Sequence, residues 1–408
     1  MSMIAIAARK LFTPLEEIVD GVVVIKDHAI RSVGSRETTA VPEGARMVEL
    51  GDKILAPGFI DIHIHGGGGH DVMEATPEAL EAVARLAVRH GTTSFLPTTL
   101  TAPAPALLRA LEGIGSLIHS WPRRGHTSTK STAEFLAEPL GIHLEGPFLC
   151  EQRRGVHPLV HLQQPSVELF RHLMDASGNT LRVLTLAPEL RGAMDLQKYA
   201  LQMGVKVALG HSDATFGEAE RAIQAGASHA VHTFNGMRAF THRETGIVGA
   251  LLTDDRVQCE VITDGVHVSF VALRMLLRAK GVPGILLVSD AVSATGMGPG
   301  RYPLGEADIF VERLAEDATG AGSLVCRNSE GKLAGSVLTQ DVAIRNMMAF
   351  TGVTLREAVT MATWNPARLL GLEHRKGCLQ PGADADLVVL EPDGTVAGAM
   401  VHGVGNFL

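Results

Sequence analysis

The chain has 408 residues and a formal charge of −8 from 36 basic and 44 acidic residues, with no dense basic run, which argues against nucleic acid as a partner. No apolar run approaches the length that spans a membrane, and residues 1–12 lack the order of a signal peptide. The four cysteines are widely scattered and form no CxxC pair, so we expect free thiols and a cytoplasmic protein.

Both ends of the chain carry short, strand-like runs separated by turn residues. These runs fall at 3–7, 21–25 and 29–33 near one end, and at 386–390, 394–396 and 399–401 near the other. Each end is too short to bury a core alone, so we predict that residues 1–56 and 373–408 are the halves of one small β-sandwich domain. Two independent β appendages are the alternative.

The stretch 59–65, Phe-Ile-Asp-Ile-His-Ile-His, alternates apolar and polar residues with the period of a strand. This alternation places Asp61, His63 and His65 on one face, and four glycines follow directly. Imidazoles two residues apart at the end of a strand lie close enough to share a divalent ion. A pair of hydrogen-bonded core histidines is the alternative, and further ligands downstream would favour the metal site.

Strand-like and helical runs alternate through residues 57–372. We expect strands at 60–65, 92–98, 140–145, 181–187, 205–211, 230–233, 257–263 and 285–290, and helices at 77–90, 195–203, 217–225, 270–279, 339–351 and 354–362. This order predicts an α/β fold, a TIM-like (β/α)8 hydrolase barrel over 57–372, with a doubly wound open sheet as the alternative. The polar run 116–133 is expected to be a mobile insertion loop.

Polar residues end most of the predicted strands. They are His63 and His65 on the first, Glu145 on the third, His211 on the fifth, His232 on the sixth, Asp264 and His267 after the seventh, and Asp290 on the eighth. Each has an ordinary explanation alone, such as a helix cap or a turn residue. Because the strand ends of a barrel meet at one face, the set together predicts a metal site. Imidazole and carboxylate without thiolate suit Zn²⁺, Fe²⁺ or Mn²⁺, so the metal identity stays open.

A metal held in this way activates water, and a free carboxylate beside it can carry protons. Asp290 is the candidate for that carboxylate, because it ends the last strand. We therefore expect hydrolysis of an unreactive bond, most naturally an amide, whose nitrogen must be protonated before it leaves.

Several motifs, in one order along the chain, resemble those of the amidohydrolase superfamily and, within it, the N-acetylglucosamine-6-phosphate deacetylases. They are PGFIDIHIH at 57–65, GIHLEGPF at 141–148, GHSDAT at 210–215, HTFNGM at 232–237, DGVH at 264–267, LAGSVLT at 333–339 and PGADADL at 381–387. The resemblance implies metal-dependent deacetylation of the 2-acetamido group of a sugar 6-phosphate, giving the amino sugar phosphate and acetate.

The resemblance also implies roles for individual residues. Glu145, His211 and His232 would bind one metal, and His63 and His65 would add a second ion bridged by Glu145. Asp290 would be the general acid and base. The substrate-binding set would be His157 at the acetamido carbonyl, His267 at the sugar, Asn235 and Gly236 near the phosphate, Leu338, and Arg243 contributed by the neighbouring subunit of a homodimer. The chain departs from the family pattern at Gly236, where alanine is commoner, and in the 116–133 insertion.

Alternatives remain at three points. His143 shares the inward face with Glu145 one step deeper, where a satisfied core histidine is the better interpretation. A dihydroorotase-like activity on a cyclic amide is one rival function, although residues 181–189 lack the lysine such sites use, and a non-catalytic scaffold is another. The sequence does not distinguish N-acetylglucosamine from N-acetylgalactosamine 6-phosphate.

Overall fold

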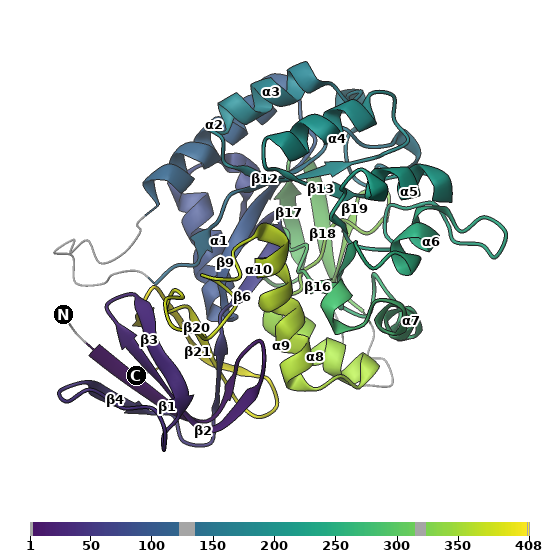
Figure 1. The fold of residues 1–408 in the computed structure, drawn as a ribbon. Coiled ribbons are helices and arrows are strands. Elements are labelled where there is room, and N and C mark those ends of the chain that lie inside the picture. Colours follow the sequence, from purple (N-terminus) through teal and green to yellow (C-terminus); the bar gives the residue numbers. More distant parts are fainter. Residues whose placement is uncertain (1–2, 122–134, 315–323, 406, 408) are drawn as a thin grey trace.

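The computed structural model describes residues 3–121, 135–314, 324–405 and 407 of the chain. Figure 1 shows a barrel of strands and helices with a smaller sheet beside it, and both chain ends lie in the smaller sheet.

Within these residues, eight parallel strands pair in a nearly closed ring. They are β6 (Phe59–Ile64), β9 (Thr92–Thr99), β11 (Ile142–Glu145), β12 (Leu181–Leu186), β13 (Lys206–Leu209), β14 (His229–Ala230), β15 (Gln258–Val261) and β16 (Ile285–Leu287), and the two-residue β10 (Glu138–Pro139) also pairs parallel with β9. A parallel bridge from Ile64 to Ala291 joins the last strand to the first. Each strand overlaps its predicted run, which confirms the TIM-like barrel and excludes the open sheet.

Helices cover the outside of the barrel. They are α1 (Pro77–Arg89), α2 (Ala104–Ser120), α3 (Val167–Ala176), α4 (Ala193–Gln202), α5 (Phe216–Gln224), α6 (Gly246–Thr253), α7 (Phe270–Lys280), α8 (Gln340–Thr351), α9 (Leu355–Ala362) and α10 (Trp364–Leu370), with 3-10 turns η1 (Val72–Glu74), η2 (Glu151–Arg153), η3 (Leu159–His161) and η4 (Val282–Gly284). Thr76 caps α1 by accepting from the backbone N–H of Ala79. None of the helices in the described ranges is long and apolar enough to cross a membrane.

Four of these helices, α2, α3, α6 and α10, were not predicted from the sequence. The prolines at 103 and 105 suggest a turn, yet proline is tolerated in the first turn of a helix, and α2 begins there. The prediction of a loop over 116–133 is wrong for 116–120, which form the last turn of α2, and 122–134 lie outside the described residues. Helix α6 is buried over most of its length and shows no amphipathic period.

The two chain ends build one mixed sheet. It contains β1 (Met3–Phe12), β2 (Glu17–Lys26), β3 (Ala29–Ser35), β4 (Arg46–Glu49), β5 (Ile54–Pro57), β20 (Leu387–Leu390), β21 (Val396–Val401) and β22 (Val404–Gly405). The ends meet where β20 pairs antiparallel with β5. The runs predicted at 394–396 and 399–401 are corrected to the single strand β21, and the boundaries at 56 and 372 stay a prediction.

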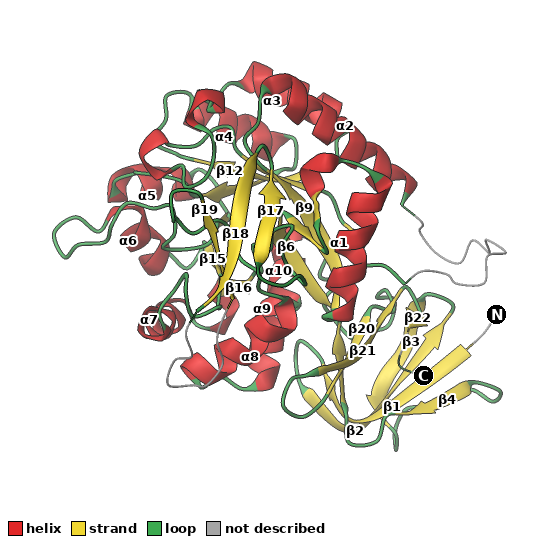
Figure 2. Cartoon of the chain, turned by 180° about the vertical axis from the view of Figure 1, so that it is seen from behind, coloured by secondary structure: helices red, strands yellow, loops and turns green. Residues whose placement is uncertain are grey.

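A small antiparallel sheet follows the eighth barrel strand and was not predicted. It contains β17 (Gly300–Leu304), β18 (Ala307–Arg313) and β19 (Leu324–Asn328), and Figure 2 shows it in front of the barrel strands. Charged residues and Pro303 interrupt its alternation, so the sequence signal is weak. A shorter pair, β7 (Gly66–Gly67) and β8 (His70–Asp71), lies after the first barrel strand.

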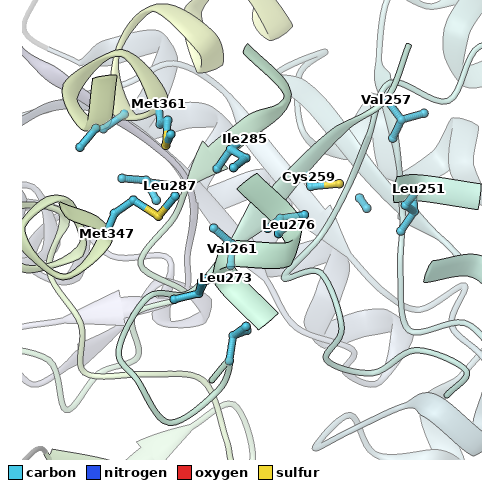
Figure 3. Packing of buried hydrophobic residues seen from close by; sticks show 14 of the residues in the cluster. Leu251, Val257, Cys259, Val261, Leu273, Leu276, Ile285, Leu287, Met347 and Met361 are labelled. Carbon is cyan, nitrogen blue, oxygen red and sulfur yellow. The ribbon is translucent and has the colours of Figure 1, made fainter. Parts of the chain in front are cut away.

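The core has layers inside and outside the barrel wall. Ile60, Ile62, Leu96 and Val183 belong to a cluster that includes residues from most of the barrel strands, while Cys259 and Val261 pack with the helices outside. Figure 3 shows this outer cluster, in which side chains of β15 and β16 meet those of α7, α8 and α9. Burial of large apolar groups on both faces of the wall fixes the strands, and therefore the positions of the residues at their ends.

Candidate active site

A cavity of about 200 Å³ opens at the carboxyl ends of the barrel strands. Residues from the predicted site line it: His65, Glu145, His157, His211, His232, Asn235, Gly236, His267 and Asp290. Leu304 and Val292 add an apolar wall. The fold therefore brings together at one end of the barrel residues that lie far apart in the sequence, as the strand-end argument predicted.

Glu145 lies at the centre of the site and is 2% exposed. Besides His157, four histidines place their Nε2 atoms near its two carboxylate oxygens, at 3.4 Å for His63, 3.3 Å for His65, 3.3 Å for His211 and 3.1 Å for His232. One buried carboxylate is therefore placed between two pairs of imidazoles. Burial disfavours its charge, but His63 and His211 in their protonated forms hold the pKa of Glu145 well below its usual range.

The other ring nitrogen of each of these histidines has a hydrogen-bond acceptor. The Nδ1 atoms of His65, His211 and His232 lie 3.0, 2.8 and 3.2 Å from the carbonyl oxygens of Thr98, Arg153 and Asn235, and Nδ1 of His63 lies 2.8 Å from a carboxylate oxygen of Glu260. Carbonyl and ionised carboxylate oxygens only accept, so the Nδ1 of each ring carries a proton, and in the neutral ring the Nε2 presents a lone pair.

Four imidazole lone pairs and a carboxylate thus converge on one volume. Groups that only accept repel one another unless a cation lies between them. Imidazole and carboxylate are the donors that Zn²⁺, Fe²⁺ and Mn²⁺ accept in proteins, and these buried His and Glu residues fit a site for such an ion.

Asp290 is a second carboxylate that lies near the two histidines of the first strand, His63 and His65. Its Oδ1 atom is 3.3 Å from Nε2 of His65 and 3.6 Å from Nε2 of His63. Burial raises the pKa of Asp290, but the charges of His63 and His65 in their protonated forms outweigh this effect, and the pKa is lowered. An ionised carboxylate therefore faces the histidine cluster.

Backbone strain coincides with three site residues. His211, His232 and Asp290 have φ values of +45°, +28° and +49°, in the left-handed region that residues with a Cβ seldom adopt. Such a conformation costs of the order of 1–3 kcal/mol and is concentrated at functional sites. Each of the three follows a barrel strand within three residues of its end, so the strain turns the side chain into the cavity.

His157 lines the cavity as a hydrogen-bond donor. Its Nδ1 atom accepts the backbone N–H of Thr101 at 3.3 Å, so the ring proton is on Nε2, which lies 3.2 Å from Glu145. Burial lowers the pKa of His157 to about 4, so the ring is neutral. His157 lies close enough to Glu145 and His211 to share a metal ion with them. It is a poor metal ligand in this tautomer, because a proton occupies the Nε2 position through which it would bind.

His267 forms a pair with Asp264 at the mouth of the cavity. Its Nδ1 lies 2.7 Å from Oδ2 of Asp264. Burial opposes the charge of His267, but the hydrogen bond and charge of Asp264 raise its pKa. The pair therefore extends the pH range over which the ring that lines the cavity is cationic.

Gly236 adopts φ +60°, and a Cβ there would lie 2.9 Å from Nδ1 of His211. Glycine at this position therefore gives the imidazole room that an alanine would take.

Two predicted substrate residues do not line the cavity. Arg243 is exposed on the loop that precedes α6, and Leu338 is buried in the barrel cluster.

His63 is fully buried and does not line the cavity, and its Nε2 is directed at Glu145. His143 has a partner for each ring nitrogen, Ile62 O at 3.0 Å and Thr185 Oγ1 at 2.7 Å, which confirms the core interpretation.

Glu260 belongs to the site and was missed. It is fully buried on β15, and its carboxylate contacts His63. An available signal was a charged residue inside an apolar strand run, Val-Gln-Cys-Glu-Val at 257–261.

Comparisons with known proteins agree with this geometry. The model of the amidohydrolase family matches residues 54–404. The chain is 40% identical to an N-acetylglucosamine-6-phosphate deacetylase of Lysinibacillus sphaericus over 349 residues, which are 86% of this chain and 84% of that protein. It is 38% identical to an N-acetylgalactosamine-6-phosphate deacetylase of Escherichia coli O157:H7 over 367 residues, which are 90% of this chain and 91% of that protein.

A solved structure superposes over nearly the whole chain. It is a mutant of the N-acetyl-D-glucosamine-6-phosphate deacetylase of Mycobacterium smegmatis in complex with N-acetyl-D-glucosamine-6-phosphate. The TM-score is 0.88 at 33% identity, and the match covers 99% of each chain.

Proposed function

The chain belongs to the amidohydrolase family, and we propose that it hydrolyses N-acetylglucosamine 6-phosphate to glucosamine 6-phosphate and acetate with the help of a bound divalent metal. The convergence of four imidazole Nε2 atoms on Glu145, with Asp290 facing them, carries this assignment. Relatives at 38–40% identity over most of the chain are deacetylases of N-acetylated hexosamine 6-phosphates. A non-catalytic scaffold would have no need to keep these buried, strained residues together.

Glu145, His211 and His232 would hold one ion, and His63 and His65 would hold a second with Glu145 between them. The metal, when bound, supplies a Lewis acid that polarises the amide and activates water near neutral pH. The composition of the donor set favours Zn²⁺ or Fe²⁺.

The protein's own groups then direct the proton transfers. The Asp290 carboxylate takes a proton from the attacking water and delivers it to the amide nitrogen as that nitrogen leaves. The Nε2–H of His157 donates to the acetamido carbonyl oxygen, because its Nδ1 is held as an acceptor by Thr101. Because His157 is neutral and buried, it donates this hydrogen bond without adding a charge that would repel the metal.

On the sugar side, cationic His267 donates to a hydroxyl, and Asn235 and Gly236 contribute backbone groups near the phosphate. Leu338 would act only through its backbone or through packing, since its side chain is buried among barrel residues.

Arg243 would bind the phosphate of a substrate held by the other subunit of a homodimer. The loop that carries it extends away from the barrel before α6 (Figure 1), and Arg243 does not line its own cavity. Nearby apolar side chains suit a protein interface: Phe240 on the same loop is 51% exposed, and Phe270, Val271 and Met275 on α7 are 52–54% exposed. Two chains that pack through this face would each lend an arginine to the other.

Deacetylation of N-acetylgalactosamine 6-phosphate is the second candidate, because one relative of almost equal identity carries that name. We further propose that residues 57–372 hold the catalytic unit, that 1–56 and 373–408 form its accessory domain, and that the enzyme works in the cytoplasm. The four cysteines are free and buried, which supports a reducing environment.

Steady-state turnover of both phosphosugars, with metal-replete protein and with protein treated with a chelator, tests the proposal. We expect metal-dependent release of acetate and a higher kcat/KM for the gluco sugar. Metal-replete protein that releases acetate from neither sugar would contradict the function, and a higher kcat/KM for the galacto sugar would select the second candidate.

A further inference from the structure

Glu260 is a buried carboxylate that no proposed step uses. Its side chain is 0% exposed on β15. Its neighbours Cys259 and Val261 point outward into the cluster shown in Figure 3, so the alternation of the strand turns Glu260 toward the barrel interior. A buried carboxylate is costly unless strong donors compensate it, so its partners indicate why it is there.

Its partners belong to both halves of the metal site. Oε2 lies 2.8 Å from Nδ1 of His63 and also accepts the backbone N–H of His232 at 3.3 Å. His232 holds a left-handed backbone conformation, φ +28°, which this hydrogen bond helps to keep. The same oxygen of Glu260 therefore orients the imidazole of His63, from one proposed pair of metal ligands, and the backbone of His232, from the other pair.

His63 differs from the other three histidines of the proposed ligand set. Their Nδ1 atoms lie against neutral backbone carbonyls, whereas that of His63 lies against a carboxylate. A carboxylate behind an imidazole fixes the tautomer and makes the opposite nitrogen a stronger donor. The Nε2 of His63 has no hydrogen-bond partner among the described residues and is directed at Glu145 and Asp290.

We infer that Glu260 is a positioning residue for the metal site, which holds the His63 imidazole with its Nε2 lone pair toward Glu145 and thereby sets the affinity of the His63/His65 ion. The inference rests on the proposed metal-dependent function and adds to it a residue outside the ligand set. Because Glu260 would act on the His63/His65 ion through His63, its effect on that ion should vanish when His63 is absent.

Glu260→Gln is the informative change, since its amide oxygen can still accept from His63 but carries no charge. Metal dissociation constants are measured by competition with a chromogenic chelator for wild type, Glu260→Gln, His63→Ala and the double variant. We expect Glu260→Gln to weaken one ion by about 10- to 100-fold, the usual effect of losing an outer-shell partner. In the His63→Ala background the same change should have no further effect on the affinity of the His63/His65 ion.

Glu138→Gln is the matched control. Glu138 is also buried and also faces a histidine, His402, at 3.0 Å, but it lies at the opposite end of the barrel on β10. This control is expected to lower the melting temperature of the metal-free protein and to leave the metal affinity unchanged.

The inference would be overturned if Glu260→Gln bound metal with wild-type affinity. It would also be overturned if the loss of affinity in the double variant equalled the sum of the losses in the two single variants. If metal-free Glu260→Gln were unfolded while metal-free Glu138→Gln remained folded, Glu260 would have a role in folding, and this result would also overturn the inference. If the wild-type protein bound no ion, both the proposed function and this inference would be overturned. If Glu260→Gln were active and bound metal with unchanged affinity, only the inference would be overturned.

Discussion

The Nε2 atoms of His211 and His232 lie 3.0 Å apart, although the Nδ1 of each ring already faces a backbone carbonyl. Two lone pairs at this distance repel each other unless a cation lies between them. Without metal, the pair can relax only by protonation or by movement of the strained backbone at both residues. Metal binding should therefore be coupled to the stability of the fold.

The first prediction is that a divalent ion stabilises the protein against heat. An ion that binds only the folded state adds about 2.7 kcal/mol to the free energy of unfolding at a concentration of 100 times its Kd. Thermal melts of chelator-treated protein should show a rise in Tm on addition of Zn²⁺ or Fe²⁺. His211→Ala should lose most of that rise, and a Tm that does not respond to metal in wild type would contradict the prediction.

The second prediction concerns the number of ions. Because His63 and His65 accompany the Glu145, His211 and His232 set, metal-replete wild type should hold up to two ions per chain. The His63→Ala, His65→Ala double variant should lose one ion and keep the other, as measured by elemental analysis after gel filtration. Wild type that never exceeds one equivalent would rule out the second ion.

The third prediction separates phosphate binding from catalysis. Arg243→Ala should raise KM for N-acetylglucosamine 6-phosphate and leave the low activity on unphosphorylated N-acetylglucosamine nearly unchanged. Arg243 is exposed and does not line the cavity, so its loss should not reduce the metal content. Sedimentation of the variant would show whether the dimer persists, and an equal loss of activity on both sugars would make the arginine structural.

The barrel could be predicted from sequence because its signals are local. Each strand is a short apolar run, and the rule that catalytic groups lie at strand ends converts order along the chain into proximity in space. The sheet from β17 to β19 could not be predicted, because Pro303 and several charged residues break its alternation and its register depends on pairing along the whole hairpin.

The site was predictable as a set of residue types but not as a set of proton positions. The tautomer of His157 depends on Thr101, 56 residues earlier, and that of His63 depends on Glu260, 197 residues later. Such contacts between distant residues leave no periodicity in the sequence. Glu260 looks like an isolated charge in an apolar strand until the barrel brings His63 beside it.

The fourth prediction is a pH dependence of stability from the His267–Asp264 pair. Burial opposes both charges, yet the pair raises the pKa of His267 above its usual 6.5 and lowers that of Asp264 below its usual 3.8. The histidine's contribution is fully present below pH 6.5 and is lost as the pH rises through its folded-state pKa. The carboxylate's contribution is present above pH 3.8 and is lost as the pH falls.

Asp264→Asn tests this pH dependence, because its amide oxygen can still accept from the backbone N–H groups of Val266 and His267. Urea denaturation should show the largest difference in the free energy of unfolding between wild type and variant near pH 5–6, with a smaller difference at pH 8. A difference that is constant across that range would mean that the pair contributes through geometry and not through charge.

The last prediction concerns Asp290, on which the proton transfers depend. Its carboxylate faces His63 and His65 at 3.6 and 3.3 Å, and the positive charge around it favours the ionised form, which a base requires. Asp290→Asn keeps the size and one hydrogen-bond acceptor but cannot take up a proton. We expect kcat to fall by at least ~10²-fold, the usual scale for a positioned acid or base. Metal content by elemental analysis and substrate binding by calorimetry should be largely retained, so that the loss lies in the chemical step. A kcat within a few-fold of wild type in metal-replete variant would remove Asp290 from this role and direct the same test to His157 and His267, which line the same cavity.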